Sequence, residues 1–147
     1  MDEAAIREYL VTAFPDIGVT DASGDSYFFT DPEKMHPFAT LVTSDAHDHV
    51  SNLNRPGVYR LNIGVGKQTF GNLFGPDRAD TDGVGDDFTA LDRILPHPVY
   101  GKMYWVCVLN PGPETFETVR GLLAEAYEAG MRRRAKHTDP GATDGGA

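Results

Sequence analysis

The segment VYRLNIGV, residues 58–65, constrains the fold of this chain more than any other stretch of the sequence. Apolar side chains alternate along it with polar or small ones: Tyr59, Leu61, Ile63 and Val65 against Arg60, Asn62 and Gly64. Successive side chains of a β-strand point to opposite faces of the sheet. This pattern predicts a strand with one face on the core and one polar face, as antiparallel sheets commonly have.

Helical patterns stand at both ends of the chain. Near the N-terminus, Asp2 is a capping residue, an apolar stripe runs from Ile6 to Phe14, and Pro15 ends the pattern. Near the C-terminus, Pro113 fits a first helical turn. A second apolar stripe follows it, consisting of Phe116, Val119, Leu122, Leu123, Ala126 and Tyr127. The basic run Arg132–Arg134 suits the negative end of that helix.

The chain between these helices is rich in strand patterns. GDSYFFTD and PFATLVTSD predict two strands, Gly66–Phe74 predicts a short helix, and MYWVCVLN predicts a central strand because it is apolar on both faces. FTALDRILPHPVYG, residues 88–101, is expected to be partly helical up to Leu95. The class expected is α+β: an antiparallel-rich sheet packed by an N-terminal and a long C-terminal helix.

Length and composition favour one domain. The 147 residues are 40% hydrophobic, and we expect a single domain over residues 1–135 followed by a disordered tail, 136–147. No stretch reaches the ~20 apolar residues of a membrane helix. The N-terminus lacks the features of a secretion signal, and Cys107 is the single cysteine. These features predict a cytoplasmic protein with no membrane association and a buried, inert thiol.

The charge balance disfavours nucleic acid as a partner. The net charge is −9, and without residues 132–147 the chain has 9 basic and 20 acidic residues, or −11. Proteins gain most of their affinity for nucleic acid by neutralising phosphates. We therefore do not expect nucleic acid to be the main partner of this chain.

Four sequence blocks occur in order along the chain: GDSYFFTDPEKMHPFATLV, SNLNRPGVYRLNIGV, LPHPVYGKMYWVCVLNP and LLAEAYE. With these blocks the chain resembles an uncharacterised bacterial family known only as a domain of unknown function. The resemblance spans nearly residues 1–135 and implies no particular activity.

A more distant resemblance is to MmcQ/YjbR-like proteins. Their plan is an N-terminal helix, a strand pair, a strand with a following helix, a histidine-to-tryptophan segment and a C-terminal helix. His97 and Trp105 would match that segment, with Lys102 before the tryptophan. The histidine-to-tryptophan spacing is longer here, and Tyr104 stands where the family usually has a second histidine. The resemblance therefore implies a fold rather than a site.

Arg60 and Asn62 are the first candidate ligand-binding residues, because both project from the polar face of the clearest strand. Arg suits a carboxylate or phosphate, and Asn adds a donor and an acceptor. Arg55 lies just upstream, near the strand entrance. The alternative is a solvated sheet face on which the arginine pairs with a neighbouring acid.

A second group of candidates lies between Leu95 and Trp105: His97, Tyr100 and Lys102. Histidine is the side chain that titrates near neutral pH without help, and Pro96 and Pro98 stiffen its backbone. The alternative is a structural histidine that is hydrogen-bonded to a backbone carbonyl. For Trp105 we favour a place in the core over a role as a ligand platform.

No metal or cofactor is expected. The segment DAHDH, residues 45–49, has two histidines at a spacing of two, but no motif supplies further ligands, so it reads as a solvated loop. The aspartates between Asp77 and Asp87 do not fit a calcium-loop template and predict a flexible acidic surface. The common catalytic and nucleotide-binding motifs are absent, and Cys107 lacks an activating base.

Three functions stay open at this point. The leading one is a non-catalytic binding or regulatory module for a small anionic ligand or a protein partner. The second is a small enzyme that uses His97 as acid or base, with Tyr100 or Arg60 holding the substrate. The third is a nucleic-acid-binding domain, by analogy of fold. Oligomeric state is not encoded in any of these patterns.

Overall fold

The computed structural model describes residues 2–76, 78–80 and 85–138. A six-stranded, fully antiparallel sheet has the spatial order β1-β2-β3-β4-β6-β5. Its strands are β1 (Gly18–Ala22), β2 (Asp25–Phe29), β3 (Pro37–Val42), β4 (Arg60–Gly64), β5 (Ile94–Pro96) and β6 (Trp105–Leu109). The helices are α1 (Glu3–Ala13), α2 (Lys67–Phe74) and α3 (Pro113–Thr138), with the short 3₁₀ turns η1 (Arg78–Asp80) and η2 (Gly101–Met103).

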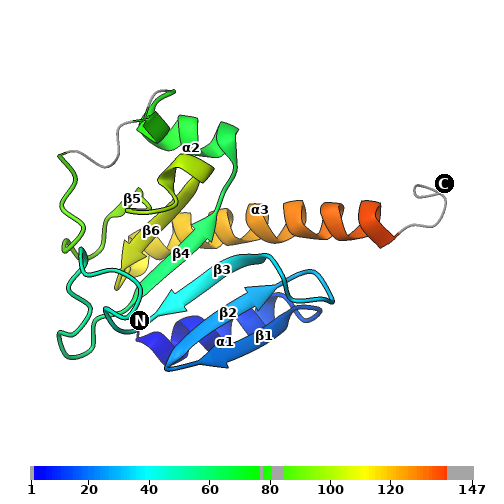
Figure 1. Ribbon diagram of the computed structural model, residues 1–147, viewed down its shortest axis with the longest axis horizontal. Coiled ribbons are helices and arrows are strands. Elements are labelled where there is room, and N and C mark those ends of the chain that lie inside the picture. Colours follow the sequence, from blue (N-terminus) through cyan, green and yellow to red (C-terminus); the bar gives the residue numbers. More distant parts are fainter. Residues whose placement is uncertain (1, 77, 81–84, 139–147) are drawn as a thin grey trace.

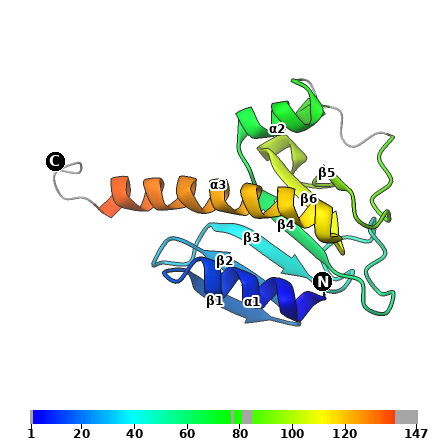
Figure 2. The ribbon, with the colours of Figure 1, turned by 180° about the vertical axis from the view of Figure 1, so that it is seen from behind.

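Helices α1 and α3 pack on the same face of this sheet, as the two opposite views show (Figure 1, Figure 2). The core lies between these two helices and the sheet. It is formed by buried side chains of the two helices and of the strands, among them Ile6, Leu10, Phe28, Ala39, Leu41, Leu61, Ile63, Val106, Val108, Val119 and Leu123. The predicted α+β architecture, an antiparallel sheet with an N-terminal and a long C-terminal helix, is confirmed.

Local sequence explains where the first helix begins and ends. Oδ1 of Asp2 accepts a hydrogen bond of 2.9 Å from the backbone N–H of Ala5, which satisfies one of the free donors of the first turn. The helix ends at Ala13, two residues before Pro15. The predicted capping residue and the predicted stop are both confirmed.

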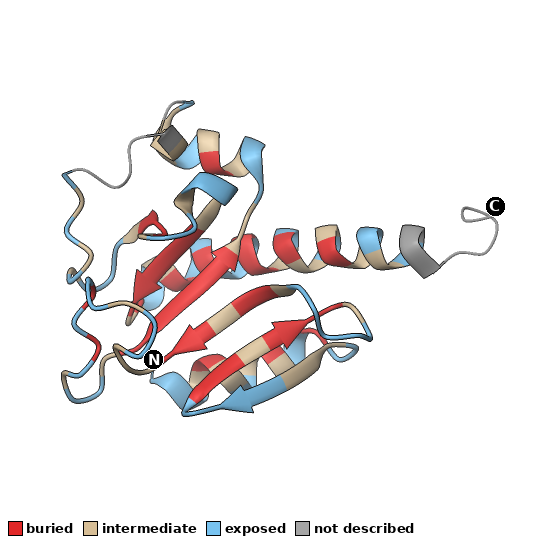
Figure 3. Cartoon of the chain, in the orientation of Figure 1, coloured by how far each residue is buried: buried red, intermediate tan, exposed pale blue. Residues whose placement is uncertain are grey.

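The strand β4 has the alternation that its sequence predicts. Leu61 and Ile63 are fully buried in the core beneath the helices. Arg60 and Asn62 point to the opposite face, which we call the open face, yet they are only 1% and 3% exposed. Figure 3 shows β4 buried along nearly its whole length. The prediction of two distinct faces is confirmed, but the polar face of this strand is not solvated.

The sheet register aligns one row of side chains across the open face. Tyr27 of β2 lies opposite Thr40 of β3, Thr40 opposite Asn62 of β4, and Asn62 opposite Cys107 of β6. Residues directly opposite each other on antiparallel strands share a face and are close enough to interact. Four strands from distant parts of the chain thus contribute side chains to one surface.

The segment before His97 corrects one prediction. Residues 88–93 contain turns and bends instead of the expected partial helix, and Ile94–Pro96 forms β5 at the edge of the sheet. Asp92 has a φ of 61°, and its N–H donates to the carbonyl of Leu109 at 2.7 Å. Pairing with β6 therefore satisfies the backbone here and overrides the local helical pattern. The strand β1 is an outer strand that the sequence patterns did not delimit.

The helix α3 continues to Thr138, past the domain boundary predicted at residue 135. The last nine residues of the predicted tail, 139–147, lie outside the described residues, so the boundary stays a prediction. Within the described part of the chain, no helix combines the length and the apolar character needed to cross a bilayer.

Candidate functional site

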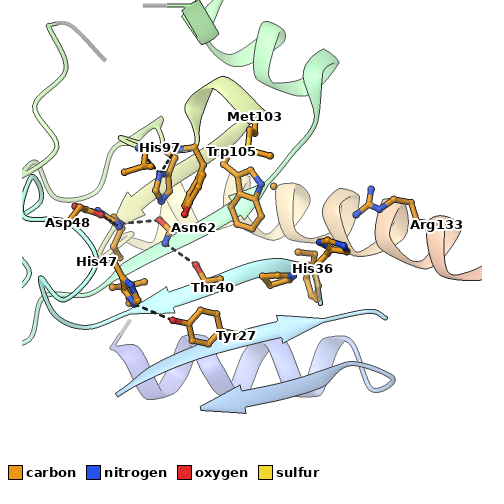
Figure 4. Close-up of a pocket in the computed structure, with 17 residues that line it drawn as sticks. Tyr27, His36, Thr40, His47, Asp48, Asn62, His97, Met103, Trp105 and Arg133 are labelled. Atoms are coloured by element: carbon orange, nitrogen blue, oxygen red, sulfur yellow. Dashed lines mark hydrogen bonds and ion pairs between the residues drawn. The ribbon is translucent and has the colours of Figure 1, made fainter. Parts of the chain in front are cut away.

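A pocket of about 750 Å³ opens on the open face of the sheet (Figure 4). Its floor is formed by strand residues, including Tyr27, Thr40, Asn62 and Trp105. The turn between β5 and β6 contributes His97 and Tyr100 to its wall. This volume falls within the range of about 300–1,000 Å³ that is typical of small-molecule sites.

A buried ion pair closes one side of the pocket. Nη1 and Nη2 of Arg60 donate to Oδ1 and Oδ2 of Asp48 at 3.0 and 2.7 Å, so the contact is bidentate. Nη1 also donates to Oγ of Ser51 at 2.9 Å. The side chain of Arg60 is 2% exposed and that of Asp48 is 13% exposed. Arg60 consequently engages its guanidinium with the protein itself, which makes it a wall residue and not a ready ligand clamp.

Asn62 links this ion pair to the floor. Its Oδ1 accepts from Nε of Arg60 at 3.1 Å, and its Nδ2 donates to Oγ1 of Thr40 at 2.9 Å. The chain of bonds fixes which side of the amide faces which neighbour. Because Thr40 accepts from Asn62, the hydroxyl proton of Thr40 can be donated toward the pocket.

The arginine also affects its partner's ionisation. Burial raises the pKa of Asp48, but the hydrogen bonds and charge of Arg60 outweigh it, and the pKa lies below its ordinary value. Asp48 is therefore ionised at neutral pH, and the charges of the pair cancel. This side of the pocket is polar without being strongly charged.

The turn that follows β5 holds His97 in one orientation. Its Nδ1 accepts two backbone hydrogen bonds, from Val99 and Tyr100, both at 3.0 Å. Its own N–H donates to the carbonyl of Trp105 at 2.9 Å, and the N–H of Gly101 donates to its carbonyl at 3.0 Å. The imidazole is thus anchored on both its backbone and its Nδ1 side.

These bonds determine the protonation of the ring. A nitrogen that accepts backbone hydrogen bonds carries no proton, so the proton of the neutral imidazole lies on Nε2. Burial, reinforced by the charge of Arg60, lowers the pKa of His97 to about 3. His97 is 6% exposed, and none of the described residues bonds to its Nε2. At neutral pH the pocket therefore contains a fixed, uncharged and unpartnered N–H donor.

Trp105 lies over Gly64 on the pocket floor. The two residues are directly opposite in the register of β4 and β6. A Cβ atom at Gly64 would come within 2.8 Å of Cε2 of the indole, so the strand can accommodate the ring only because this position is glycine. The indole is half-buried and lines the pocket. The prediction that Trp105 belongs to the core is therefore wrong, because its indole is part of the pocket surface.

Positive charge is found on the other side of the pocket. Figure 4 shows Arg133 reaching from α3 toward the pocket, near His36, while His97 and Asp48 lie on the opposite side with Trp105 between them. Arg133 is exposed and forms no hydrogen bond or ion pair with another described residue. The pocket therefore has a neutral donor at one side, an aromatic floor, and a cation at its other side.

The loop 43–59 supplies part of the wall and corrects one interpretation of the DAHDH segment. Besides Asp48, its His47 is directed at the sheet, with Nε2 2.9 Å from Oδ2 of Asp25 and 3.2 Å from the hydroxyl of Tyr27. The interpretation as a merely solvated loop is wrong for Asp48, which is largely buried. The side chain of His47 contacts the sheet but stays 52% exposed. Within the described chain, no group of three or more His, Cys, Asp or Glu residues has the arrangement of a metal site.

The six candidates from the sequence divide into two groups. Arg60, Asn62, His97 and Tyr100 all line the pocket. Arg55 does not: it donates to the backbone carbonyls of Ser51, Asn52 and Thr89 and so holds the loop 43–59 in place. Lys102 is exposed in η2 and is not part of the pocket lining.

The structure adds residues that sequence reasoning missed, chiefly Tyr27, Thr40, His36 and Arg133. The alternation of β2 and β3 could have indicated Tyr27 and Thr40. Nothing local indicated Arg133, because its run of arginines is also what a helix end favours.

Two further sequence features, the acidic loop and Cys107, contribute no described residue to the pocket lining. Residue 77 and residues 81–84 of the acidic loop fall outside the described residues, and Asp86 pairs with Arg78 at 2.6 Å. Cys107 is 1% exposed, and burial raises the pKa of its thiol to about 12. The prediction of a buried thiol is confirmed.

Comparisons with known proteins place the chain in a family without revealing a function. Neither the curated proteins nor the solved structures contain a significant match. One family model matches residues 1–139, which is nearly the whole chain, and it describes a family of unknown function. The chain therefore belongs to the family of unknown function DUF6194.

Proposed function

We propose that this protein is a non-catalytic binding module that holds a small anionic ligand in the pocket of the open face. One observation carries the proposal: in a cavity of about 750 Å³, His97 presents a buried N–H donor and Arg133 a positive charge, and neither has a partner among the described residues. Small-molecule sites are typically apolar cavities with a few fixed polar groups that orient the ligand.

The charge distribution favours an anion at the Arg133 side. The whole chain has a net charge of −9, so its surface repels anions in general. Arg133 bears a charge that no described residue neutralises. A bound anion thus meets a local attraction within an otherwise negative surface.

Acid–base catalysis by His97 has less support. A general base works best when its pKa lies near the operating pH. The pKa of His97 is lowered to about 3, and its Nδ1 already accepts two backbone bonds. A proton added to the ring would create a buried charge next to Arg60, so the ring is suited to donating a hydrogen bond rather than to accepting a proton.

Binding of nucleic acid or of a protein partner also has less support than binding of a small anion. Nucleic acid would have to bind a chain whose basic run, Arg132–Arg134, is small against its 22 acidic residues. A protein partner would leave the buried donor of His97 without a specific role.

The kinship with MmcQ/YjbR-like proteins, the bacterial origin and the cytoplasmic location are further parts of this proposal. The order of elements, from α1 through the His97–Trp105 segment to α3, supports the kinship.

Thermal unfolding against a panel of anionic metabolites, nucleotides, metal ions and short DNA tests the proposal. A ligand at 100 times its Kd adds about 2.7 kcal/mol to the free energy of unfolding. For a chain of this size that raises Tm by roughly 5 to 10 °C. We expect at least one anionic compound to do so and the metal ions and DNA to have no effect.

Two substitutions at one position make the test specific. In His97→Asn the amide oxygen can replace Nδ1 as acceptor for the turn, but the donor at Nε2 is lost. His97→Gln retains a donor near Nε2 and loses the acceptor. Ligand stabilisation should disappear in His97→Asn and persist in part in His97→Gln. His49→Asn, at an exposed histidine outside the pocket lining, is the control.

Two results would contradict the proposal. One is the same ligand-induced rise of Tm in wild type and His97→Asn, since the ligand would then sit elsewhere. The other is turnover of a stabilising compound by the purified protein, which would make the domain an enzyme.

A further inference from the structure

We infer that the ligand of this pocket is a flat aromatic acid, stacked on Trp105, with its acid group at Arg133 and a neutral hydrogen-bond acceptor at Nε2 of His97. This inference rests on the proposed function and specifies the chemical class of the ligand. Three independent features of the pocket lead to it, one for each part of such a molecule.

The aromatic part follows from the contact between Trp105 and Gly64. The glycine allows the indole to lie against β4, and any side chain with a Cβ would push it away. A ring that lies against the sheet presents its other face outward. Tyr100 and Tyr27 also line the pocket. A flat face bordered by aromatic rings favours a planar π-system over a branched aliphatic chain, because stacked aromatic pairs gain energy beyond their buried area.

The neutral acceptor follows from the state of His97. Its Nε2–H is fixed by the two backbone bonds to Nδ1 and has no partner among the described residues. A buried donor without an acceptor costs free energy. A ligand that supplies a carbonyl, ether or ring nitrogen as the acceptor therefore gains binding free energy from this hydrogen bond. The neighbouring charges of Arg60 and Asp48 are already paired at 2.7 Å, and they leave no net charge that would select an ion here.

The acid group follows from the opposite side of the pocket. Arg133 is exposed and unpaired within the described chain, and it points toward the pocket from α3 (Figure 4). Arginine binds carboxylate and phosphate oxygens in a bidentate manner. Because the donor and the cation lie on opposite sides of Trp105, the acceptor and the acid should stand at opposite ends of the ligand.

A set of four probes separates these three parts. The first is an acetylnaphthoate whose carboxylate and acetyl groups stand at opposite ends of the ring system. The others are naphthoate, which lacks the acceptor, acetylnaphthalene, which lacks the acid, and the fully saturated counterpart of the first, which lacks the flat ring. Isothermal titration calorimetry measures the Kd of each. The acetylnaphthoate should bind most tightly, and each omission should weaken binding roughly tenfold.

Substitutions then assign each part to a residue. Arg133→Gln, at an exposed position, should remove the preference for acetylnaphthoate over acetylnaphthalene. His97→Asn should remove its preference over naphthoate. Trp105→Leu should remove its preference over the saturated probe, and Trp105→Phe should retain that preference. Gly64→Ala leaves the indole in the chain but displaces it, so it should resemble Trp105→Leu.

The outcomes distinguish this inference from the proposed function. If the saturated probe binds as tightly as the aromatic one, or Trp105→Leu binds all four probes like wild type, the aromatic inference is overturned. If an aliphatic anion stabilises wild type but not His97→Asn, the binding function stands and only the aromatic class is wrong. If no anion of either kind binds, both fail. The Arg133→Gln result holds even if a Trp105 variant does not fold.

Discussion

Arg60 and Asp48 form a bidentate ion pair at one side of the pocket, although they come from a central strand and from a loop 12 positions earlier in the chain. The arginine side chain is 2% exposed, so it has given up nearly all contact with water. Removing one partner of such a pair leaves a buried charge without compensation. The pair therefore joins the loop 43–59 to the sheet and makes the wall of the pocket part of the folded core.

Asp48→Ala should consequently be strongly destabilising. We expect a loss of about 3–5 kcal/mol in the free energy of unfolding, measured by urea denaturation, because Arg60 remains buried without its acceptor. The matched control is Glu117→Ala in the exposed pair of Glu117 with Arg120, which should cost under ~1 kcal/mol. Equal losses in the two variants would show that the burial of Arg60 does not matter to stability.

Stability should decline with falling pH well above the range in which carboxylates titrate. The pKa of His97 is 6.5 in the unfolded chain and about 3 in the folded one, so between these values the unfolded state binds more protons. The free energy of unfolding must then fall as pH falls, by at most about 1.4 kcal/mol per pH unit from this group. Below about pH 3.8, protonation of Asp48 begins to add a further loss, since its folded pKa is lowered.

Urea unfolding of wild type and His97→Asn between pH 4.5 and pH 7.5 checks this dependence. The variant should show a shallower slope, because asparagine does not titrate. If His97→Asn and wild type have the same slope, the buried histidine is not the group that couples folding to pH in this range.

Two glycines of α3 should respond to alanine in opposite ways. At Gly121 a new Cβ would meet nothing within 4 Å, so Gly121→Ala should stabilise the protein by about 0.5–1 kcal/mol. At Gly130 it would collide with Oγ1 and Cγ2 of Thr30, which is 6% exposed. Gly130→Ala should therefore destabilise despite the better helix propensity. Adding Thr30→Ala should recover part of that loss, and strict additivity of the two changes would contradict the collision.

The thiol of Cys107 should resist modification in the native protein. Its pKa is raised to about 12 by burial, and its Sγ lies 3.7 Å from the carbonyl oxygen of Pro96. A disulfide reagent at pH 8 should label it only as fast as the protein unfolds, and rapidly in urea. Rapid labelling under native conditions would mean that β5 detaches from β6 readily.

Sequence reasoning succeeded where one segment carries the whole signal. The alternation of Leu61 and Ile63 with Asn62 predicted both the strand and its two faces, and Asp2 predicted the start of α1. It failed where the local structure depends on contacts with residues far away in the sequence. Residues 88–93 follow a helical pattern, but the residues after them form β5 by pairing with the edge of β6.

The candidate site was predictable in part for the same reason. Local sequence patterns identify the strand of Arg60 and Asn62 and the turn of His97. The three residues were therefore found as candidates, and they do line one pocket. An ion pair of Arg60 with an acid was one of the two alternatives, but the burial of the pair and the identity of the acid were not predicted, because no local pattern indicates that Asp48 folds back over β4. Arg133 was missed because only the length of α3 and the path of the sheet bring it to the pocket.

The row Tyr27–Thr40–Asn62–Cys107 limits how this family can vary. In β4 the residues that line the pocket and the residues that fill the core occupy alternate positions. A slip of a single residue in pairing would exchange them, placing Leu61 in the pocket and Arg60 under the helices. An insertion or deletion within this strand would therefore disrupt both the core and the pocket floor. The part of the pocket that β4 supplies can therefore change by substitution at fixed positions, whereas the loop 43–59 and the turn between β5 and β6 are not bound by this register.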